Sequence, residues 1–213
     1  YLGMNERVAL PGVLGKPSVM SALAALAVGI AREESLERMA QTLETLETPP
    51  GRMRIVSGKK GSVIIDDSYN SSPVAGEAAL ETLRAVSGKR KIAILGDMLE
   101  LGLFAKEEHH KIGRIAGGFV DLLVTVGKRA RFIAEGARDS GLGGEKIQEF
   151  ADSETAGKWM TERVRSGDII LAKGSQGWGE DMIRIERAVK LIMAHPEDAK
   201  KLLVRQEDEW FRH

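Results

Sequence analysis

Polar side chains able to bind a small charged ligand follow three apolar stretches of this chain. They occupy residues 66–70 (Asp-Asp-Ser-Tyr-Asn), 96–98 (Gly-Asp-Met) and 173–175 (Lys-Gly-Ser). Carboxylates can accept hydrogen bonds from ribose hydroxyls or stand in the second shell of a magnesium ion, and a tyrosine offers a flat face to a base. A lysine, a free backbone amide and a hydroxyl suit a carboxylate or a phosphate. An acidic loop, such as the one after residue 96, suits a cationic amine.

Each of these motifs also has a plain structural alternative. Asp, Ser and Asn commonly satisfy the backbone groups of turns, which would explain residues 66–70 without a ligand. Residues 96–102 would serve equally as a strand–loop–helix connection. Ser175 would serve equally as the N-cap of a helix. Spacing alone leaves both interpretations open.

Several familiar sites are absent from the sequence. The dinucleotide fingerprint G-x-G-x-x-G and the P-loop G-x-x-x-x-G-K-[ST] do not occur, so the chain has no triphosphate cradle of its own. His109 and His110 are adjacent and point to different faces of a helix, without an H-E-x-x-H motif. We expect a solvated helix with one packed histidine there, and no metal site.

Composition excludes other classes. The 31 basic and 31 acidic residues balance, so no overall field steers the chain to nucleic acid or to an anionic membrane. No apolar stretch has the roughly 18 uncharged residues of a membrane span. There is no cysteine, which removes disulfides and thiolate sites and fits a reducing cytoplasm. The chain begins with Tyr1, and we expect it to be a piece of a longer protein.

Hydrophobic periodicity and breaker residues predict the secondary structure. Residues 49–51 (Pro-Pro-Gly) are the strongest break and predict a domain boundary. Two helices are expected before it, a buried one over 18–30 capped by Ser18 and another over 35–46. The strands expected after it are 54–57, 62–65, 91–95, 122–126, 147–150 and 168–172. The helices expected after it are 73–86, 106–116, 130–137, 153–165 and 181–193, with a helical tail over 202–213 that packs Trp210 and Phe211.

Strands that alternate with amphipathic helices predict parallel pairing and helices on both faces of a sheet. The predicted fold class is a doubly wound α/β fold. Sites in such folds lie at the carboxyl ends of the strands, where all three polar motifs fall. Residue-level reasoning therefore predicts a strand-end site for a small anionic or zwitterionic ligand.

Two of the motifs carry a family resemblance. Residues 66–73 (DDSYNSSP) and 94–102 (ILGDMLELG) resemble the D-D-S-Y-N-A-N-P and G-D-M-x-E-L-G motifs of the Mur ligase superfamily, in the branch that adds D-alanyl-D-alanine. Arg52 matches the arginine of that family's P-G-R motif. The resemblance extends over roughly residues 12–190.

The resemblance implies a three-domain, ATP-dependent amide ligase of peptidoglycan precursor synthesis. Residues 1–49 would be the end of the central ATP-binding domain, and residues 50–213 the Rossmann-like C-terminal domain. The implied substrates are ATP with Mg²⁺, UDP-N-acetylmuramoyl-tripeptide and D-alanyl-D-alanine. The magnesium ligands, the P-loop and the N-terminal domains are expected upstream, so this chain should be inactive alone and hold no catalytic residue.

Site residues follow from the same motifs. The implied nucleotide-binding residues are Arg52, Asp67, Tyr69 and Asn70, and the implied acceptor-binding residues are Asp97, Lys173 and Ser175. Arg52 would contact the ATP phosphates, Asp67 would bond the ribose, and Tyr69 and Asn70 would flank the nucleotide.

The sequence departs from the family pattern in two places. Ser18 and Ser21 stand where two asparagines usually lie near adenine, and Pro17 stands where a histidine does. Gln176 replaces the arginine of K-G-S-R and is followed by residues 177–179 (Gly-Trp-Gly). Two alternatives therefore stay open, a Mur-type ligase with another amino-acid acceptor and a non-catalytic α/β binding module.

Overall fold

A computed structural model describes residues 5–177, 182–207 and 210 of the chain. It divides into two compact units, Tyr1–Pro49 and Pro50–His213. Each unit is described by itself. That the first unit is the end of an ATP-binding domain stays a prediction.

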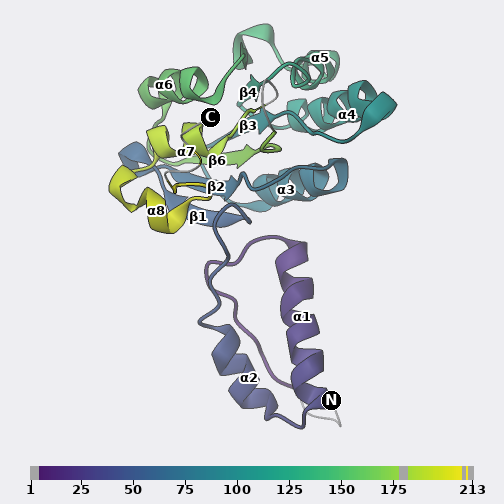
Figure 1. Cartoon of the computed structure of the whole chain (residues 1–213), viewed down its shortest axis with the longest axis vertical. Helices are drawn as coiled ribbons and strands as arrows, with labels where there is room; N and C mark the ends of the chain where they lie inside the picture. Colours follow the sequence, from purple (N-terminus) through teal and green to yellow (C-terminus); the bar gives the residue numbers. More distant parts are fainter. Residues whose placement is uncertain (1–4, 178–181, 208–209, 211–213) are drawn as a thin grey trace. The chain divides into compact units, whose positions relative to one another are not determined.

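The first unit consists of two helices, α1 (Lys16–Ala31) and α2 (Leu36–Leu43) (Figure 1). They pack closely, because a Cβ on Gly29 would lie 2.0 Å from the sulfur of Met39. The Ser35 hydroxyl caps α2 by accepting a hydrogen bond from the Arg38 amide at 3.4 Å. Helix α2 ends before the predicted Leu46.

The prediction of a buried helix capped by Ser18 is wrong. Helix α1 begins at Lys16, because Pro17 has the fixed φ that favours the first helical turn. The Ser18 hydroxyl instead donates to the Leu14 carbonyl at 2.9 Å. Ala22 is the buried residue of α1, whereas Met20 is 64% exposed. An apolar surface on all sides of a helix needs partners on all sides, and α2 covers only part of it.

The second unit is built on a six-stranded sheet, as predicted. Its strands are β1 (Arg54–Ser57), β2 (Val63–Asp67), β3 (Arg90–Gly96), β4 (Leu122–Val126), β5 (Ile147–Phe150) and β6 (Asp168–Lys173). The order across the sheet is β1-β2-β6-β3-β4-β5. Strand β1 pairs with β2 antiparallel, and all other neighbours are parallel. This confirms the predicted α/β class.

Helices cover both faces of the sheet. Figure 1 shows α3 (Pro73–Ala85), α4 (Ala105–Gly117) and α5 (Arg131–Asp139) on one side, and α6 (Ser153–Arg163) and α7 (Glu186–Ile192) on the other. Short 3-10 turns lie at Lys59–Gly61, Gly102–Phe104, Gly144–Lys146 and Pro196–Asp198. Strand residues such as Ile64, Ile94 and Ile170 form the core with side chains of α6 and α7, including Met160 and Val189.

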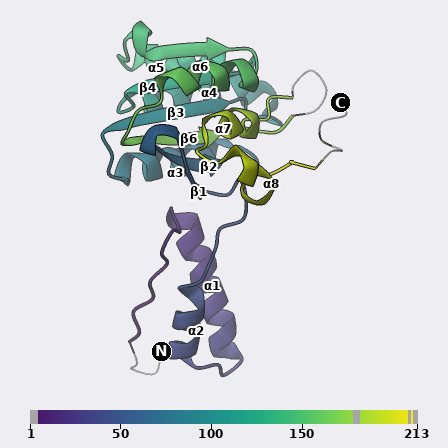
Figure 2. The ribbon, with the colours of Figure 1, turned by 90° about the vertical axis from the view of Figure 1, so that its left-hand side faces the viewer.

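The C-terminal segment differs from its prediction. Helix α7 begins at Glu186, after Arg184 adopts a left-handed φ of 49° that a helix does not tolerate. Residue 181, the predicted start, lies outside the described residues. Within the expected tail helix, residues 203–207 are not helical, and a short helix, α8 (Ala199–Leu202), precedes them and lies beside β1 (Figure 2).

The Trp210 carbonyl accepts a hydrogen bond from Nη1 of Arg184 at 2.7 Å, so part of the tail packs on the unit as expected. Phe211, the other predicted packing residue, lies outside the described residues. Over the described part of the chain, no helix is long and apolar enough to cross a membrane.

Candidate functional site

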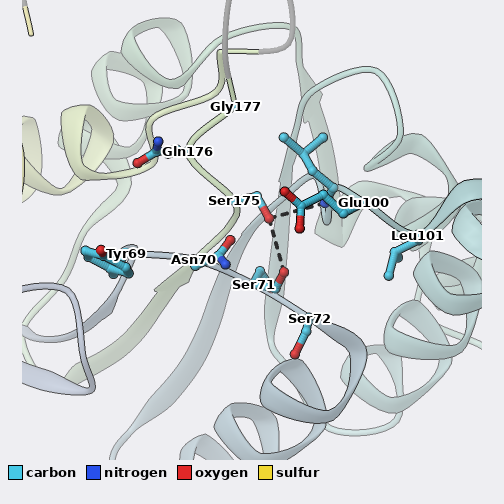
Figure 3. Close-up of a pocket in the computed structure, with 10 residues that line it drawn as sticks. Tyr69, Asn70, Ser71, Ser72, Glu100, Leu101, Ser175, Gln176 and Gly177 are labelled. Atoms are coloured by element: carbon cyan, nitrogen blue, oxygen red, sulfur yellow. Dashed lines mark hydrogen bonds between the residues drawn. The ribbon is translucent and has the colours of Figure 1, made fainter.

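The three polar motifs meet at one edge of the sheet. Strands β2, β6 and β3 are neighbours and parallel, so the loops that follow them emerge side by side. The Ser175 hydroxyl donates to the Ser71 carbonyl at 3.1 Å and accepts from the Leu99 amide at 3.2 Å (Figure 3). The Ser175 amide donates to the Asp97 carbonyl at 2.8 Å. Ser175 therefore links the three loops and fixes their spacing.

Hydrogen bonds of the backbone join the segment before β1 to the end of β2 and to the loop that follows it. The Gly51 amide donates to Oδ2 of Asp66 at 3.1 Å, and the Met53 amide donates to Oδ1 of Asp67 at 3.1 Å. The Tyr69 amide returns a bond to the Gly51 carbonyl at 3.1 Å. Gly51 has a φ of 69°, and a Cβ there would lie 2.9 Å from the Tyr69 nitrogen, so this approach requires glycine.

These hydrogen bonds of Gly51 and Met53 place Arg52 against Tyr69. The guanidinium carbon of Arg52 lies 4.1 Å from the centre of the Tyr69 ring, within the range of a cation–π contact. Tyr69 is 45% exposed and Arg52 is exposed, so both remain open to a ligand. A flat ring beside a permanent cation can stack a base and attract a phosphate.

Asp67 and Lys173 form a buried ion pair. The lysine Nζ lies 2.6 Å from Oδ2 of Asp67 and also donates to the Asn70 carbonyl at 3.0 Å. Burial raises the pKa of the Asp67 carboxyl, and the nearby Lys173 charge acts in the opposite direction. Only 3% of the Lys173 side chain is exposed. The pair therefore fixes the loop after β2 from within.

Asp97 points away from the ligand-facing loops. Its Oδ1 accepts hydrogen bonds from the amides of Arg129 at 2.9 Å and Ala130 at 2.6 Å. Burial raises the pKa of the Asp97 carboxyl, whereas these amides and the Arg129 guanidinium favour its charged form. The side chain thus caps the turn before α5. The prediction that it contacts an acceptor substrate is not tested by this geometry.

His109 is the packed histidine that the sequence predicts. Its Nε2 accepts a hydrogen bond from the Met98 amide at 2.8 Å, so its proton must be on Nδ1, which donates to the Ala105 carbonyl at 2.6 Å. Burial lowers the pKa of His109, which favours this neutral form. The ring fixes the start of the loop after β3.

These loops enclose a pocket of about 440 Å³, within the usual range for small-molecule sites. Figure 3 shows Tyr69 and Gln176 at one end and Leu101 and Ser72 at the other, with the Glu100 side chain between them, beside Ser175. Most of the lining side chains are polar. Three predicted residues, Tyr69, Asn70 and Ser175, line the pocket directly.

Arg205 is a residue of this region that the sequence analysis missed. Its Nε donates to Oε1 of Gln176 at 2.7 Å, and its Nη2 donates to the Tyr69 carbonyl. Its Nη1 lies 3.1 Å from the buried Glu186 carboxylate. No local motif marks Arg205, because its partners are far away in sequence. Its guanidinium lies beside Gln176, the residue that stands where the K-G-S-R motif has an arginine.

The acids of this region do not form a metal site. Among the described residues, no three carboxylate or imidazole groups gather into a cluster that could hold a metal ion. Glu100 is the acid that lines the pocket, and the neighbouring Asp66 and Asp67 are occupied by backbone amides and Lys173. These residues therefore do not fit a magnesium ion.

Asp66 predicts a pH dependence of stability. It is fully buried, and this burial raises its pKa from 3.8 to about 6 against hydrogen bonds from Ser68. Because the folded state binds this proton more tightly than the unfolded state, the Asp66 contribution to stability is full below about pH 4 and is lost as the pH rises through about 6. The loss is at most about 3 kcal/mol.

The measurement is the free energy of unfolding of the native protein and of Asp66→Asn between about pH 4 and pH 7, the range that spans this titration. The substitution is expected to shift stability at every pH, since it disturbs the Gly51 contact. The substitution also removes the titrating carboxyl. The difference between the two proteins in the slope of the free energy of unfolding against pH therefore isolates the titration of Asp66. Parallel curves for the two proteins would contradict the prediction.

Comparison with known proteins decides the family. The model of the Mur ligase, glutamate ligase domain, matches residues 51–176. The chain belongs to the Mur ligase family. The match spans β1 to the loop after β6 and includes every predicted site residue.

Mur ligases similar to this chain include a UDP-N-acetylmuramoyl-tripeptide–D-alanyl-D-alanine ligase of Bacillus subtilis, 32% identical over 91% of the chain and 41% of that protein. The same enzyme of Mycobacterium leprae is 33% identical over 79% of the chain and 36% of that protein. The chain thus spans about two fifths of the length of these relatives.

A solved structure of MurF ligase from Thermotoga maritima in complex with ADP superposes with a TM-score of 0.72. It is 28% identical and covers 91% of this chain and 41% of that chain. The likeness confirms the Mur ligase fold predicted from the two motifs.

Proposed function

We propose that this chain is the C-terminal part of an ATP-dependent ligase that joins D-alanyl-D-alanine to UDP-N-acetylmuramoyl-tripeptide. The observation that carries the proposal is 32% identity to a ligase of that name along 91% of the chain. The polar pocket at the ends of β2, β3 and β6 supports it, because this is where α/β folds bind ligands. The proposal includes a cytoplasmic location, where ATP is available.

The proposed reaction has two steps. A tripeptide carboxylate oxygen takes the γ-phosphoryl group of ATP, which releases ADP and gives an acyl phosphate. The amine of D-alanyl-D-alanine then attacks the acyl carbon, so that a C–N bond forms, the C–O bond to phosphate breaks, and the amine proton passes to solvent. Magnesium would neutralise phosphate charge, and we place its ligands in the remainder of the protein. This chain contributes by positioning the substrates.

Arg52, Tyr69 and Asn70 are the proposed direct nucleotide contacts. All three are exposed, and Arg52 already stacks on Tyr69. We assign a positioning role to Asp67, because both of its oxygens already accept hydrogen bonds from Met53 and Lys173. Lys173 and Ser175 would likewise support the acceptor end of the site through the loops that they join.

The test replaces Tyr69 in the whole ligase and follows phosphate release. Tyr69→Ala removes the stacking face and is expected to raise the KM for ATP about 5- to 150-fold, the effect of roughly 1–3 kcal/mol of stacking. Tyr69→Phe keeps the face and serves as the matched control. Equal KM values for ATP in all three proteins would refute the nucleotide contact.

The same assay separates the alternatives. Phosphate release by the native enzyme that requires D-alanyl-D-alanine supports the proposed substrate. Release that ignores the dipeptide and responds to another amine would keep the ligase but change its acceptor. No release with any amine would favour a non-catalytic binding module.

A further inference from the structure

We propose that Glu100 is the carboxylate that binds the ammonium group of the incoming amine substrate. The inference deepens the proposed ligase function and rests on it. It assigns to Glu100 the role of ammonium ligand, for which the sequence offered Asp97 in the same loop. Asp97 itself is fully buried and caps the turn before α5.

The pocket has a single charge. Among the described residues that line it, Glu100 is the only aspartate, glutamate, lysine, arginine or histidine. The rest of the lining offers hydroxyl, amide and apolar groups, such as those of Ser72, Asn70 and Leu101. A pocket with one carboxylate and several neutral donors and acceptors matches a small molecule that carries an ammonium group.

The Glu100 carboxylate is free to take a ligand. Within the described part of the chain it makes no hydrogen bond or ion pair, and Glu100 is exposed. The other acids of this edge are engaged. Asp66 and Asp67 bind backbone amides, and Asp67 also binds Lys173. An ammonium ion entering the pocket therefore meets one carboxylate whose charge is not already compensated.

The loop holds Glu100 in a defined orientation. The two preceding amides are fixed, that of Met98 by His109 and that of Leu99 by Ser175. Glu100 itself has a φ of 64°, which is unfavourable for a residue with a Cβ. Figure 3 shows its side chain turned into the pocket from this strained position. A fixed carboxylate binds a cation with less loss of conformational entropy.

Opposite charges lie at separate places in the site. Arg52 stacks on Tyr69 at one end of the pocket, whereas Glu100 lines the pocket away from that end, beside Ser175 (Figure 3). A polyphosphate is attracted to Arg52 and repelled by Glu100, and an ammonium group has the reverse preference. This separation directs the nucleotide and the amine to different parts of one site.

The experiment compares Glu100→Gln with the native enzyme in the whole ligase, with phosphate release as the readout. The loss of a charge-assisted hydrogen bond is expected to raise the KM for D-alanyl-D-alanine about 10- to 150-fold. The KM values for ATP and for the UDP-tripeptide should stay within about 2-fold, a margin set by ordinary assay scatter rather than by a lost contact. Glu107→Gln, an exposed acid in the first turn of α4, is the matched control and should leave all three unchanged.

A second probe reads the charge interaction directly. D-lactyl-D-alanine has a hydroxyl in place of the ammonium group and is used as an inhibitor. The native enzyme should bind it at least about 10-fold more weakly than D-alanyl-D-alanine, and Glu100→Gln should bind the two about equally. A merely structural role would change both affinities by the same factor.

The outcomes separate the inference from the function. If the native ligase releases phosphate with D-alanyl-D-alanine and Glu100→Gln has an unchanged KM for it, the inference is wrong and the function stands. An equal rise in all three KM values, or unchanged discrimination against the hydroxyl analogue, also overturns the inference. If the native protein ligates no amine, the proposed function fails and the inference falls with it.

Discussion

Replacing Lys173 with methionine is expected to destabilise the second unit by about 3–5 kcal/mol, the usual effect of removing one partner from a buried ion pair. The lysine Nζ lies 2.6 Å from the Asp67 carboxylate, and only 3% of its side chain is exposed. Methionine fills a similar volume without a charge. The loss therefore comes mainly from leaving the buried Asp67 without its counter-charge.

Two companion measurements test this reason. Asp67→Asn in the Lys173→Met background removes the unpaired charge but keeps an oxygen for the Met53 amide, so it should restore part of the stability. The defect of Lys173→Met should also shrink at acidic pH. Burial already raises the pKa of Asp67, and loss of the lysine removes an influence that lowers it.

Chemical denaturation of native protein, Lys173→Met and Lys146→Met provides the data. Lys146 is exposed in the turn before β5, so its replacement should change the free energy of unfolding by less than about 0.5 kcal/mol. An equally small effect at Lys173 would show that the ion pair contributes little to stability.

Replacing Gly136 with alanine is expected to destabilise the second unit by at least about 3 kcal/mol, at the upper end of overpacking effects. A Cβ at this position would lie 2.0 Å from the His110 carbonyl oxygen. The contact is reciprocal, because a Cβ on Gly113 would lie 2.0 Å from the Ile133 carbonyl oxygen. Backbone atoms of α4 and α5 therefore touch, and no side chain can move aside.

Thermal unfolding measures this effect. A loss of about 3 kcal/mol corresponds to a fall in Tm of roughly 6–12 °C for a unit of this size. Gly144→Ala is the matched control, since a Cβ there meets nothing within 4 Å. A Tm for Gly136→Ala close to that of the control would show that the helices can separate without loss of stability.

The sequence by itself determined the fold class and the edge of the sheet at which the polar motifs meet. Continuous apolar strands such as 122–126 and amphipathic helices between them require a parallel sheet covered on both faces. Since sites in such sheets lie at the carboxyl ends of strands, the three polar motifs were correctly expected at one edge. The family also followed from two of these motifs, which are local in sequence.

The helix ends were less predictable. A buried helix was expected over 18–30, yet α1 exposes most of its apolar residues, because periodicity cannot show whether a partner is present. The predicted helix over 181–193 was shortened at its start, where Arg184 takes a left-handed conformation. Nothing in the side chain of an arginine indicates such a φ.

Only the tertiary structure decided the roles of the polar residues. Asp97 and Glu100 stand in one acidic loop, and their sequence gives no reason to separate them. In the folded unit, Asp97 is turned inward onto the amides before α5, whereas Glu100 faces the pocket. Arg205 reaches Gln176 from 29 residues away. Sequence patterns record local spacing, and contacts between distant segments depend on how the strands are ordered in the sheet.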